Sequence, residues 1–373
     1  MDLKFSEEQE MFKNMARDFL TTECPMKLVR DMEDDEEGHP RELWQKMADL
    51  GWHGLAFPEE YGGGDGTFID LAVLLEEAGR ACLPGPFFST IVLGGLPILD
   101  LGNEEQKEKF LPQIASGAMV MTLAFSEADT KLDSSSMKVS AVSDGQDYTI
   151  NGTKLFVPYA HVCDWLICVA RTKDDGTESN ENINLFLVNK ESQGVSCTLL
   201  ETMAHDKQCE VTFHDVKVPK EDILGGGWNG VTEILQKATV AKCIEMVGQL
   251  QRVLEMSVDY AKQRIQFGRP IGSFQAIQHH CANMAVDVEA ARLVAYRAAW
   301  LISEGLPCAK EVSTAKAWLN EACQRVMALG HQIHGAIGFT WDHDMQLFSR
   351  RAVAARVSLG DTHFHREQVA SLL

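Results

Sequence analysis

Hydrophobic and polar positions recur along this chain with two different periods, and the change of period divides it into three parts. From Ser6 to Ser116, apolar residues return every three to four positions, which is typical of helices with one buried face. From Val120 to Val216 the period falls to two, as in strands. After Gly225 the helical period returns. The pattern therefore predicts a helical unit, a β unit and a second helical unit.

The first part predicts five helices. Ser6 followed three residues later by Gln9 is the pattern of a capping box, so the first helix is expected to begin there. The other four are predicted at 40–50, 68–80, 90–101 and 104–116. Between the second and the third, the run 51–64 is rich in Gly and Pro and predicts a loop.

The middle part predicts eight short strands, separated by turn pairs such as Asp144-Gly145 and Asn151-Gly152. They are expected at 120–125, 138–142, 147–150, 153–157, 165–170, 183–188, 195–199 and 209–216. Tight turns of this kind favour an antiparallel sheet. The polar stretch 172–182 is interpreted as a solvated loop.

The third part predicts four longer helices, at 231–264, 275–304, 308–337 and 344–358. Pro219 and the glycines of 225–230 separate them from the β unit. The fold class is therefore multi-domain α+β. We expect an N-terminal helical domain at 1–118, a middle antiparallel β domain at 119–225 and a C-terminal helical domain at 226–373.

The glycines from Gly225 to Gly230 spell the dinucleotide-binding pattern G-x-G-x-x-G. That pattern works where a strand leads directly into it within a βαβ unit. Here Pro219 and the acidic pair Glu221-Asp222 intervene, and the preceding strands are expected to be antiparallel. We therefore reject a nucleotide site at this point and interpret the glycines as an interdomain hinge.

Composition sets limits on the function. The 373 residues, 45% of them hydrophobic, suffice for two or three packed units. Lys and Arg number 34 against 54 Asp and Glu, and no long basic run offsets the net charge of −20. A surface for nucleic acid or anionic membranes is therefore not expected. No apolar run is long enough to span a bilayer.

The ten cysteines indicate a reducing, cytoplasmic location. They are scattered without a Cys-x-x-Cys pair, which in a long chain favours free thiols. The first ten residues carry charges and lack the apolar segment of a secretory signal. Paired histidines, such as His279-His280 and His331 with His334, lack Cys or carboxylate support, so no metal site is predicted.

The segment 260–275 carries the strongest candidate chemistry. It ends a helical pattern with Arg264 and Gln266, breaks at Gly268, and begins a new helix at Gln275. A guanidinium donates in a fixed fork that suits a pyrophosphate, and a helix start adds unpaired amide donors. On spacing alone, however, an Arg before a helix break is more often simply solvated.

This segment, Tyr-Ala-Lys-Gln-Arg-Ile-Gln-Phe-Gly-Arg-Pro-Ile-Gly-Ser-Phe-Gln, resembles the signature of the acyl-CoA dehydrogenase family. These are flavoenzymes that desaturate acyl-CoA thioesters between the α and β carbons. The Glu-Glu-Tyr-Gly-Gly run at 59–63 and the Val-Leu-Leu-Glu-Glu-Ala-Gly-Arg run at 73–80 resemble further landmarks of that family. The resemblance covers nearly the whole chain. It implies a fold in which the β domain and a C-terminal four-helix bundle enclose FAD, with tetramers formed through the bundles.

The resemblance implies FAD contacts from four stretches of the chain. Residues 332–339 are similar to a stretch in which Gln and paired glycines meet the ADP half of a neighbouring subunit's flavin. Residues 124–127 and 151–158 are similar to the strands at the flavin ring. The FAD-binding residues so implied are Phe125, Ser126, Phe156, Arg264, Gln266, Phe267, Ile271, Gln275, Gln332, Gly335 and Ala336.

Some of these residues also have ordinary structural interpretations. Gly335 or Gly338 would serve as a helix C-cap, and Phe125 and Phe156 would lie in the core of the sheet. The chain also departs from the family pattern. Ala336 replaces one of the paired glycines, the usual Gly-Ala-Gly-Ser-Asp run after Glu127 is missing, and Pro158 stands where many members have Thr. A proline offers no hydroxyl to the flavin N5, so electron transfer or flavin reoxidation is expected to be tuned differently.

The catalytic base is absent from both positions that the family uses. Removal of a proton α to a thioester needs a carboxylate in a dry pocket, which raises its pKa. The resemblance places that residue at Leu359 or, in a minority of members, at Ala238. The nearby carboxylates Asp361 and Glu245 are the candidate bases. Alternatively, Asp361 contacts the ribose or adenine of FAD and Glu245 is a buried packing carboxylate.

The function implied is FAD-dependent α,β-dehydrogenation of an acyl-CoA, with electrons passed to electron-transfer flavoprotein. Some members that act on steroid side chains are heterotetramers in which one subunit lacks the Glu, and residues 360–367 resemble such subunits. The alternative is therefore a non-catalytic partner subunit. A homotetramer with a relocated base, acting on a dicarboxylic or alicyclic acyl group, remains open. A scaffold without cofactor is disfavoured, because two FAD-like stretches would then be coincidence.

Overall fold

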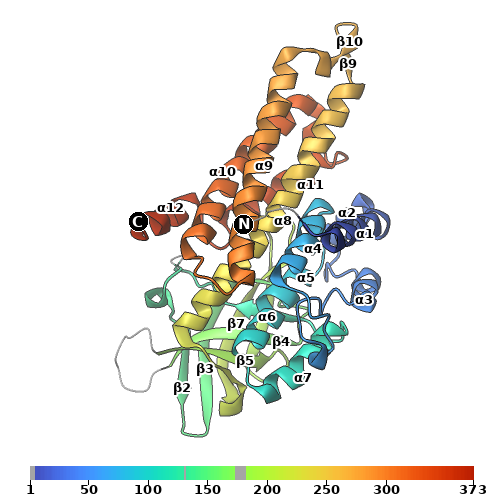
Figure 1. Cartoon of the computed structure of the whole chain (residues 1–373). Coiled ribbons are helices and arrows are strands. Elements are labelled where there is room, and N and C mark those ends of the chain that lie inside the picture. The colour runs from blue at the N-terminus through green and yellow to red at the C-terminus, as the bar shows by residue number, and fades with distance from the viewer. Residues whose placement is uncertain (1–4, 130–131, 173–181) are drawn as a thin grey trace. The chain divides into compact units, whose positions relative to one another are not determined.

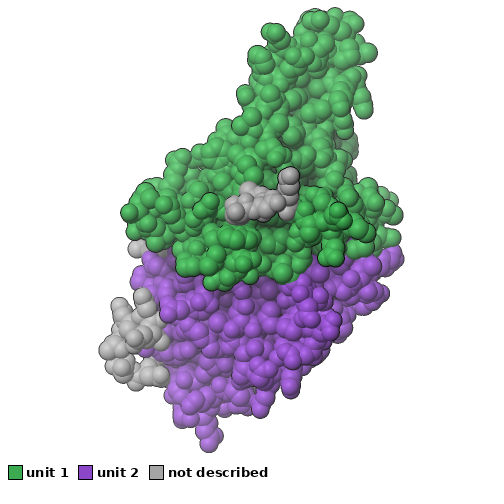
Figure 2. All heavy atoms as spheres, in the orientation of Figure 1, with its two compact units in different colours: residues 1–30, 67–83, 239–373 green, residues 31–66, 84–238 purple. Residues whose placement is uncertain are grey.

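The computed structural model describes residues 5–129, 132–172 and 182–373. Two compact units, coloured separately in Figure 2, make up the chain. Unit 1 comprises Met1–Arg30, Thr67–Leu83 and Thr239–Leu373, and unit 2 comprises Asp31–Gly66 and Pro84–Ala238. Each unit thus combines segments that are distant in the sequence. The domain boundaries at 118/119 and 225/226 stay a prediction.

Unit 1 is helical (Figure 1). α1 (Glu7–Glu23) begins with the predicted capping box, in which Ser6 and Gln9 exchange two hydrogen bonds of 3.1 Å. α4 (Phe68–Arg80) has the predicted bounds. The other helices of this unit are the second part of α8 (Gly227–Gln263), α9 (Gln275–Ser303), α10 (Ala309–His334), α11 (Met345–Val357) and α12 (Thr362–Ser371). Of these, only α12 was not predicted.

Two glycines allow α4 and α8 to touch backbone to backbone. A Cβ on Gly248 would lie 1.8 Å from the carbonyl oxygen of Glu76, and one on Gly79 would lie 2.0 Å from that of Glu245. Any other residue at either position would push the helices apart, because backbone cannot move aside as a flexible side chain can.

The carboxylate of Glu76 is buried beside this helix contact and fully paired. It accepts hydrogen bonds from the Lys13 ammonium at 3.0 Å, the Arg292 guanidinium at 3.2 Å and the Tyr296 hydroxyl at 2.7 Å. Burial acts to raise the pKa of Glu76, but Lys13 and Arg292 outweigh it and lower the pKa. The carboxylate therefore remains ionised and joins α1, α4 and α9.

Unit 2 contains a sheet in the strand order β6-β7-β3-β2-β4-β5-β8, with β1 paired to β4. The sheet is mixed rather than wholly antiparallel, because β1 and β2 both run parallel to β4. Long connections lead from both strands into β4, as parallel pairing requires. The strands are β1 (Met121–Ala124), β2 (Ser140–Ser143), β3 (Asp147–Pro158), β4 (Trp165–Thr172), β5 (Ile183–Asn189), β6 (Val195–Leu200), β7 (Gln208–Pro219) and β8 (Ile223–Leu224).

The predicted turn at Asn151-Gly152 is wrong, because β3 runs through it without a break. The register against β7 shifts between Ile150 and Gly152, so the pair forms a β-bulge. Gly152 takes φ = 134°, and a Cβ there would lie 2.8 Å from Cγ2 of Val139. Glycine is needed for the bulge and for this close approach, not for a turn.

The remaining helices partly follow the sequence pattern. α3 (Arg41–Asp49) and α7 (Glu104–Ala115) were predicted, whereas α2 (Met26–Asp34) was not. A π-helical turn, η2 (Ile91–Gly95), interrupts the helix predicted at 90–101 and divides it into α5 (Phe87–Thr90) and α6 (Leu96–Leu101). The glycine segment 225–230, interpreted as a hinge, runs into α8, whose first residue is Gly227.

The described residues also form short 3-10 turns: η1 (Glu59–Tyr61), η3 (Ser134–Ser136), η5 (Lys220–Asp222), η6 (Ile271–Ser273) and η7 (Gly335–Phe339). The predicted loop at 172–182 lies mostly outside the described residues. Within the part of the chain that the structure describes, no helix has both the length and the apolar composition needed to cross a membrane.

Candidate functional site

The residues predicted at the flavin ring lie in unit 2, where β1 ends. Phe125 is buried with its ring 6.5 Å from that of Trp228, whereas Ser126 is partly exposed. The backbone N–H of Leu155 donates to the carbonyl of Ser126 at 2.8 Å and so fixes this segment to β3. The Ser126 hydroxyl has no partner among the described residues and is free to meet a ligand.

A buried ion pair holds the same segment in place. Lys154 is 0% exposed, and its ammonium donates to the Glu127 carboxylate at 2.7 Å and to the Phe125 carbonyl at 3.0 Å. The Glu127 carboxylate also accepts from the backbone N–H groups of Lys138 at 2.7 Å and Val139 at 3.2 Å. Buried ions are tolerated where hydrogen bonds saturate them, as here. The pair thus joins three chain segments around Ser126.

Phe156 lies on a second bulge of β3 and not in the sheet core. The register against β7 shifts between Lys154 and Val157, Phe156 takes φ = 53°, and its side chain is 59% exposed. A positive φ is costly for a bulky residue, and such strain is most often retained at functional sites. The core interpretation is therefore wrong for Phe156, while the buried Phe125 is compatible with it.

The predicted pyrophosphate-binding segment forms a short hairpin in unit 1. β9 (Ile265–Gln266) pairs antiparallel with β10 (Arg269–Pro270) where the chain passes from α8 into α9 (Figure 1). The Ile271 N–H donates to the Arg264 carbonyl at 2.8 Å and closes the hairpin. Phe267, at the turn, takes φ = 53° and is 91% exposed.

Three polar side chains predicted to bind FAD, on the hairpin and at the start of α9, are free. Arg264, Gln266 and Gln275 are exposed, and none has a side-chain partner within the described residues. α9 begins at Gln275 without a side-chain N-cap, so its first amides remain open. Arg269 differs, because its guanidinium lies 4.2 Å from the ring centre of Phe274. A free guanidinium, free carboxamides and an open helix start fit the phosphates of a dinucleotide.

The second FAD-like stretch follows α10. Gly335 takes φ = 66° and ψ = −148°, a conformation almost restricted to glycine, and its N–H donates to the carbonyl of His331. The C-cap role of Gly335 is therefore confirmed. An added Cβ there would meet nothing within 4 Å, so the backbone is also open to a ligand. Gln332 and Ala336 are exposed beside it.

Neither candidate base lies in a dry, unpaired environment. Asp361 is exposed, and its carboxylate accepts from the Phe364 N–H at 2.8 Å, which caps α12. Glu245, on α8, is ion-paired with Lys242 of the same helix. Either residue would have to leave its present partner before it could act as a base.

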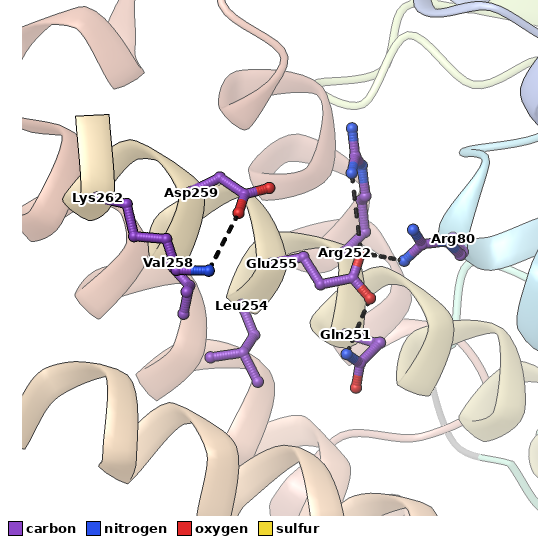
Figure 3. Close-up of a pocket in the computed structure, with 8 residues that line it drawn as sticks. All are labelled: Arg80, Gln251, Arg252, Leu254, Glu255, Val258, Asp259 and Lys262. Carbon is purple, nitrogen blue, oxygen red and sulfur yellow. Dashed lines mark hydrogen bonds and ion pairs between the residues drawn. The ribbon is translucent and has the colours of Figure 1, made fainter. Parts of the chain in front are cut away.

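A groove of about 480 Å³ in unit 1 contains none of the predicted site residues. It is lined by Arg80 of α4 and by residues of α8 between Gln251 and Lys262 (Figure 3). Its charges pair with one another: Arg80 and Arg252 with Glu255, and Lys262 with Asp259. Because these cations already have partners, the groove is not a candidate anion site. Among the described residues, no group of three or more His, Cys, Asp or Glu could hold a metal.

Three family models match the chain. The acyl-CoA dehydrogenase N-terminal domain matches residues 6–118, the middle domain 122–216 and the C-terminal domain 225–373. Among curated relatives, subunit CarC of the caffeyl-CoA reductase-Etf complex of Acetobacterium woodii is 32% identical over 377 residues, covering 99% of each chain. The probable acyl-CoA dehydrogenase YngJ of Bacillus subtilis is 31% identical over 386 residues, covering 100% of each.

Two solved structures match the fold over the whole chain. Butyryl-CoA dehydrogenase from Megasphaera elsdenii superposes with a TM-score of 0.91 at 28% identity, covering 100% of this chain and 99% of that chain. A chain of the ChsE4-ChsE5 complex from Mycobacterium tuberculosis gives 0.91 at 27% identity, covering 100% and 98%. The predicted order of helices, sheet and helices is thereby confirmed.

Proposed function

The chain belongs to the acyl-CoA dehydrogenase family, and from this premise we propose that it carries out FAD-dependent α,β-dehydrogenation of an acyl-CoA. Members of the family are FAD-dependent flavoproteins, and the chain is an acyl-CoA oxidoreductase. The observation that supports this proposal best is the hairpin that exposes Arg264 and Gln266 without side-chain partners within the described residues, next to the exposed Phe267.

We propose that eleven residues, in three groups, hold the cofactor. When bound, FAD supplies the acceptor for a hydride from the substrate β carbon. The free Ser126 hydroxyl and the exposed Phe156 would lie at its ring, beside Phe125. Arg264, Gln266, Phe267, Ile271 and Gln275 would hold the pyrophosphate and its surroundings, and Gln332, Gly335 and Ala336 would meet the ADP half of a neighbouring subunit's flavin.

The proton from the substrate α carbon goes to a carboxylate, and we propose Asp361 or Glu245 for that role. The α C–H bond breaks, its electron pair forms the new double bond, and hydride leaves the β carbon. Asp361 would give up the cap of α12, and Glu245 would give up Lys242. Excluding water from the carboxylate would raise its pKa and strengthen it as a base.

We further propose that the electrons pass to an electron-transfer flavoprotein and that the chain works as a tetramer. The relative CarC is a subunit of a reductase-Etf complex, which supports the choice of acceptor. Val286 and Leu293 expose apolar side chains along α9, which supports an interface on the helical bundle. The tetramer would contain either four copies of this chain or copies of a related subunit as well.

A second candidate is a non-catalytic partner subunit of a heterotetrameric acyl-CoA dehydrogenase. The observation that favours it is the state of the two carboxylates, one engaged in a helix cap and the other in an ion pair. The structural neighbour ChsE4-ChsE5 is itself a complex of two differently named chains.

Anaerobic addition of an acyl-CoA panel to the purified protein tests the function. Loss of the visible flavin absorption with one thioester, abolished by Asp361→Asn or by Glu245→Gln, would establish a self-sufficient dehydrogenase and its base. Asp259→Asn, an exposed carboxylate of α8, is the matched control. Re-oxidation of chemically reduced protein by enoyl-CoA, without bleaching by any saturated thioester, would assign the reductive direction instead. A flavin that responds to neither would favour the partner-subunit candidate.

A further inference from the structure

A thiol and an imidazole form a group in unit 2 that the proposed reaction does not use. The sulfur of Cys209, on β7, lies 3.5 Å from Nδ1 of His161, and Nε2 of His161 lies 3.0 Å from the carbonyl oxygen of Glu37. A carbonyl can only accept, so Nε2 carries the ring proton and Nδ1 is free to accept the thiol proton. A nucleophile, a base and a group that orients the base are the arrangement that activates a cysteine.

A second thiol lies beside the first. β6 and β7 are antiparallel, with Cys197 opposite Val211 and Leu199 opposite Cys209. The two cysteines are therefore diagonal neighbours on one face of the sheet. Cys209 is buried, whereas Cys197 is partly exposed. A small reagent can thus approach the pair from the Cys197 side.

The pKa shifts of Cys209 and His161 favour a reactive Cys209 thiolate. Hydrogen bonding with Cys197, followed by that with His161, lowers the pKa of Cys209 despite its burial. Burial acts to lower the pKa of His161, but the hydrogen bonds with Cys209 and with the Glu37 carbonyl outweigh it and raise that pKa. A thiolate next to an imidazolium is the reactive form of cysteine.

We propose that Cys209 and Cys197 are an oxidisable thiol pair that hydrogen peroxide converts to a cross-strand disulfide, with His161 as the base. The Cys209 thiolate attacks one peroxide oxygen, the O–O bond breaks, and the hydroxide takes the imidazolium proton of His161 and leaves as water. The Cys197 sulfur then attacks the sulfenic acid, and a second water leaves as the S–S bond forms. Two thiols lose two electrons, and one peroxide gains them.

The position of Cys209 connects this pair to the proposed flavin site. In the β3–β7 register, Cys209 pairs with Val157, the residue after the bulge that exposes Phe156. A disulfide at Cys209 would therefore restrain the strand beside the predicted ring contact. This effect on the flavin rests on the proposed function, whereas formation of the disulfide does not.

The test treats the purified full chain with hydrogen peroxide, alkylates the remaining thiols, and maps disulfides by mass spectrometry. We expect the Cys197–Cys209 disulfide to form first, while Cys281, a partly exposed cysteine of α9 whose pKa burial raises, stays reduced. Absence of this disulfide, or faster oxidation of Cys281, would overturn the proposal.

Two variants test whether His161 activates Cys209 or whether the two thiols react only because they lie close together. His161→Gln should slow the disulfide at least about tenfold, because the base is lost. Cys197→Ser should leave Cys209 as a sulfenic acid that a cyclic diketone captures, and this variant keeps the test valid if His161→Gln does not fold. An unchanged rate in His161→Gln, or no capture in Cys197→Ser, would contradict the assigned roles. In the coloured holoprotein, oxidation should shift the flavin absorption; a colourless protein would count against the proposed function alone.

Discussion

The two groups of residues predicted to bind FAD are built in opposite ways. In unit 2, Ser126 lies on backbone that Leu155 and the buried pair of Lys154 and Glu127 hold through short hydrogen bonds. In unit 1, Arg264 is exposed on a small hairpin, and its side chain has no partner in the described part of the chain. Internal hydrogen bonds thus hold the backbone of the first group in place, whereas the side chain of Arg264 in the second group can bind a ligand.

This difference separates folding from binding. Removal of an internal contact leaves a buried group unsatisfied and lowers the free energy of unfolding. Removal of a free side chain changes that free energy little and affects only the complex. Substitutions in the two regions should therefore give opposite ratios of stability loss to affinity loss.

Lys154→Met should lower the free energy of unfolding by about 3 to 5 kcal/mol, because the Glu127 charge is then buried without its partner. Denaturant titration followed by circular dichroism measures the loss. Lys138→Met is the matched control, since only the backbone of exposed Lys138 bonds to Glu127. The double variant Lys154→Met, Glu127→Leu should recover much of the loss. Equal stability of both single variants would contradict the assignment.

Mild acid should weaken unit 2 through two buried histidines. Burial is the main cause that lowers the pKa of His53 to about 3 and the pKa of His39 to about 4. Both pKa values lie below the value of about 6.5 in the unfolded chain. The contribution of the neutral histidines to the free energy of unfolding is therefore fully present above about pH 6.5 and is lost as the pH falls towards 4 and 3. At pH 5 the loss should be about 2 kcal/mol per histidine.

Thermal unfolding at pH 7.5 and pH 5 measures this loss. His53→Phe should reduce the pH dependence, whereas the exposed His205→Gln should not. The pKa of Glu76 is lowered, so its contribution is present above about pH 4.3 and is lost only at lower pH. A melting temperature that is constant from pH 7.5 to pH 5 would refute the assignment to the histidines.

Arg264→Ala should weaken FAD binding about 10- to 100-fold, the range for loss of one charge-assisted contact. The melting temperature of the apoprotein should not change, because the side chain has no internal partner among the described residues. Flavin fluorescence during reconstitution of the apoprotein gives the affinity. Arg269→Ala, on the same hairpin but stacked on Phe274, should bind FAD almost normally. A lower melting temperature of the Arg264→Ala apoprotein would show that the Arg264 side chain also stabilises the fold, contrary to the difference drawn between the two groups.

Phe267→Ala should have the smallest effect on folding. Its side chain is 91% exposed, so the free energy of unfolding should change by less than about 0.5 kcal/mol. The same change in buried Phe186 of β5, which is 0% exposed, should cost about 3 to 5 kcal/mol. Denaturant titrations of the two apoproteins provide the measurement. A large loss for Phe267→Ala would mean that the hairpin is part of the folded core.

Much of the fold was predictable because helices with one buried face repeat their pattern over many residues. α9 is an example, and the capping box at Ser6 even gave the start of α1. α2 was missed although Met26, Val29 and Met32 recur at helical spacing, because its nine residues span fewer than three turns. Asn151-Gly152 is equally suited to a hairpin turn and to a bulge, and only the pairing partner β7 decides between them.

The candidate site was predictable where single residues carry the chemistry, and less so where the surroundings decide. Arg264 and Gln266 could be selected because segment 260–275 resembles the family signature, whereas spacing alone favoured a solvated Arg. Nothing in the local pattern showed that Lys154 is buried, because a lysine in a strand is ordinarily solvated. Its partner Glu127 is 27 residues away and joins it only through pairing in the sheet. The engaged states of Asp361 and Glu245 likewise depend on tertiary contacts.

The glycines at the contact of α4 with α8 restrict how this sequence can diverge. An added methyl at Gly79 or Gly248 would collide with a carbonyl oxygen of the facing helix. In a saturation library selected for folded protein, both positions should therefore retain glycine. Gly64, where the nearest atom to an added Cβ lies 3.5 Å away, should accept alanine in the same library. At these two positions of α4 and α8, the carbonyl oxygens of Glu245 and Glu76 therefore limit which residues are tolerated, and the chemistry of the candidate site does not.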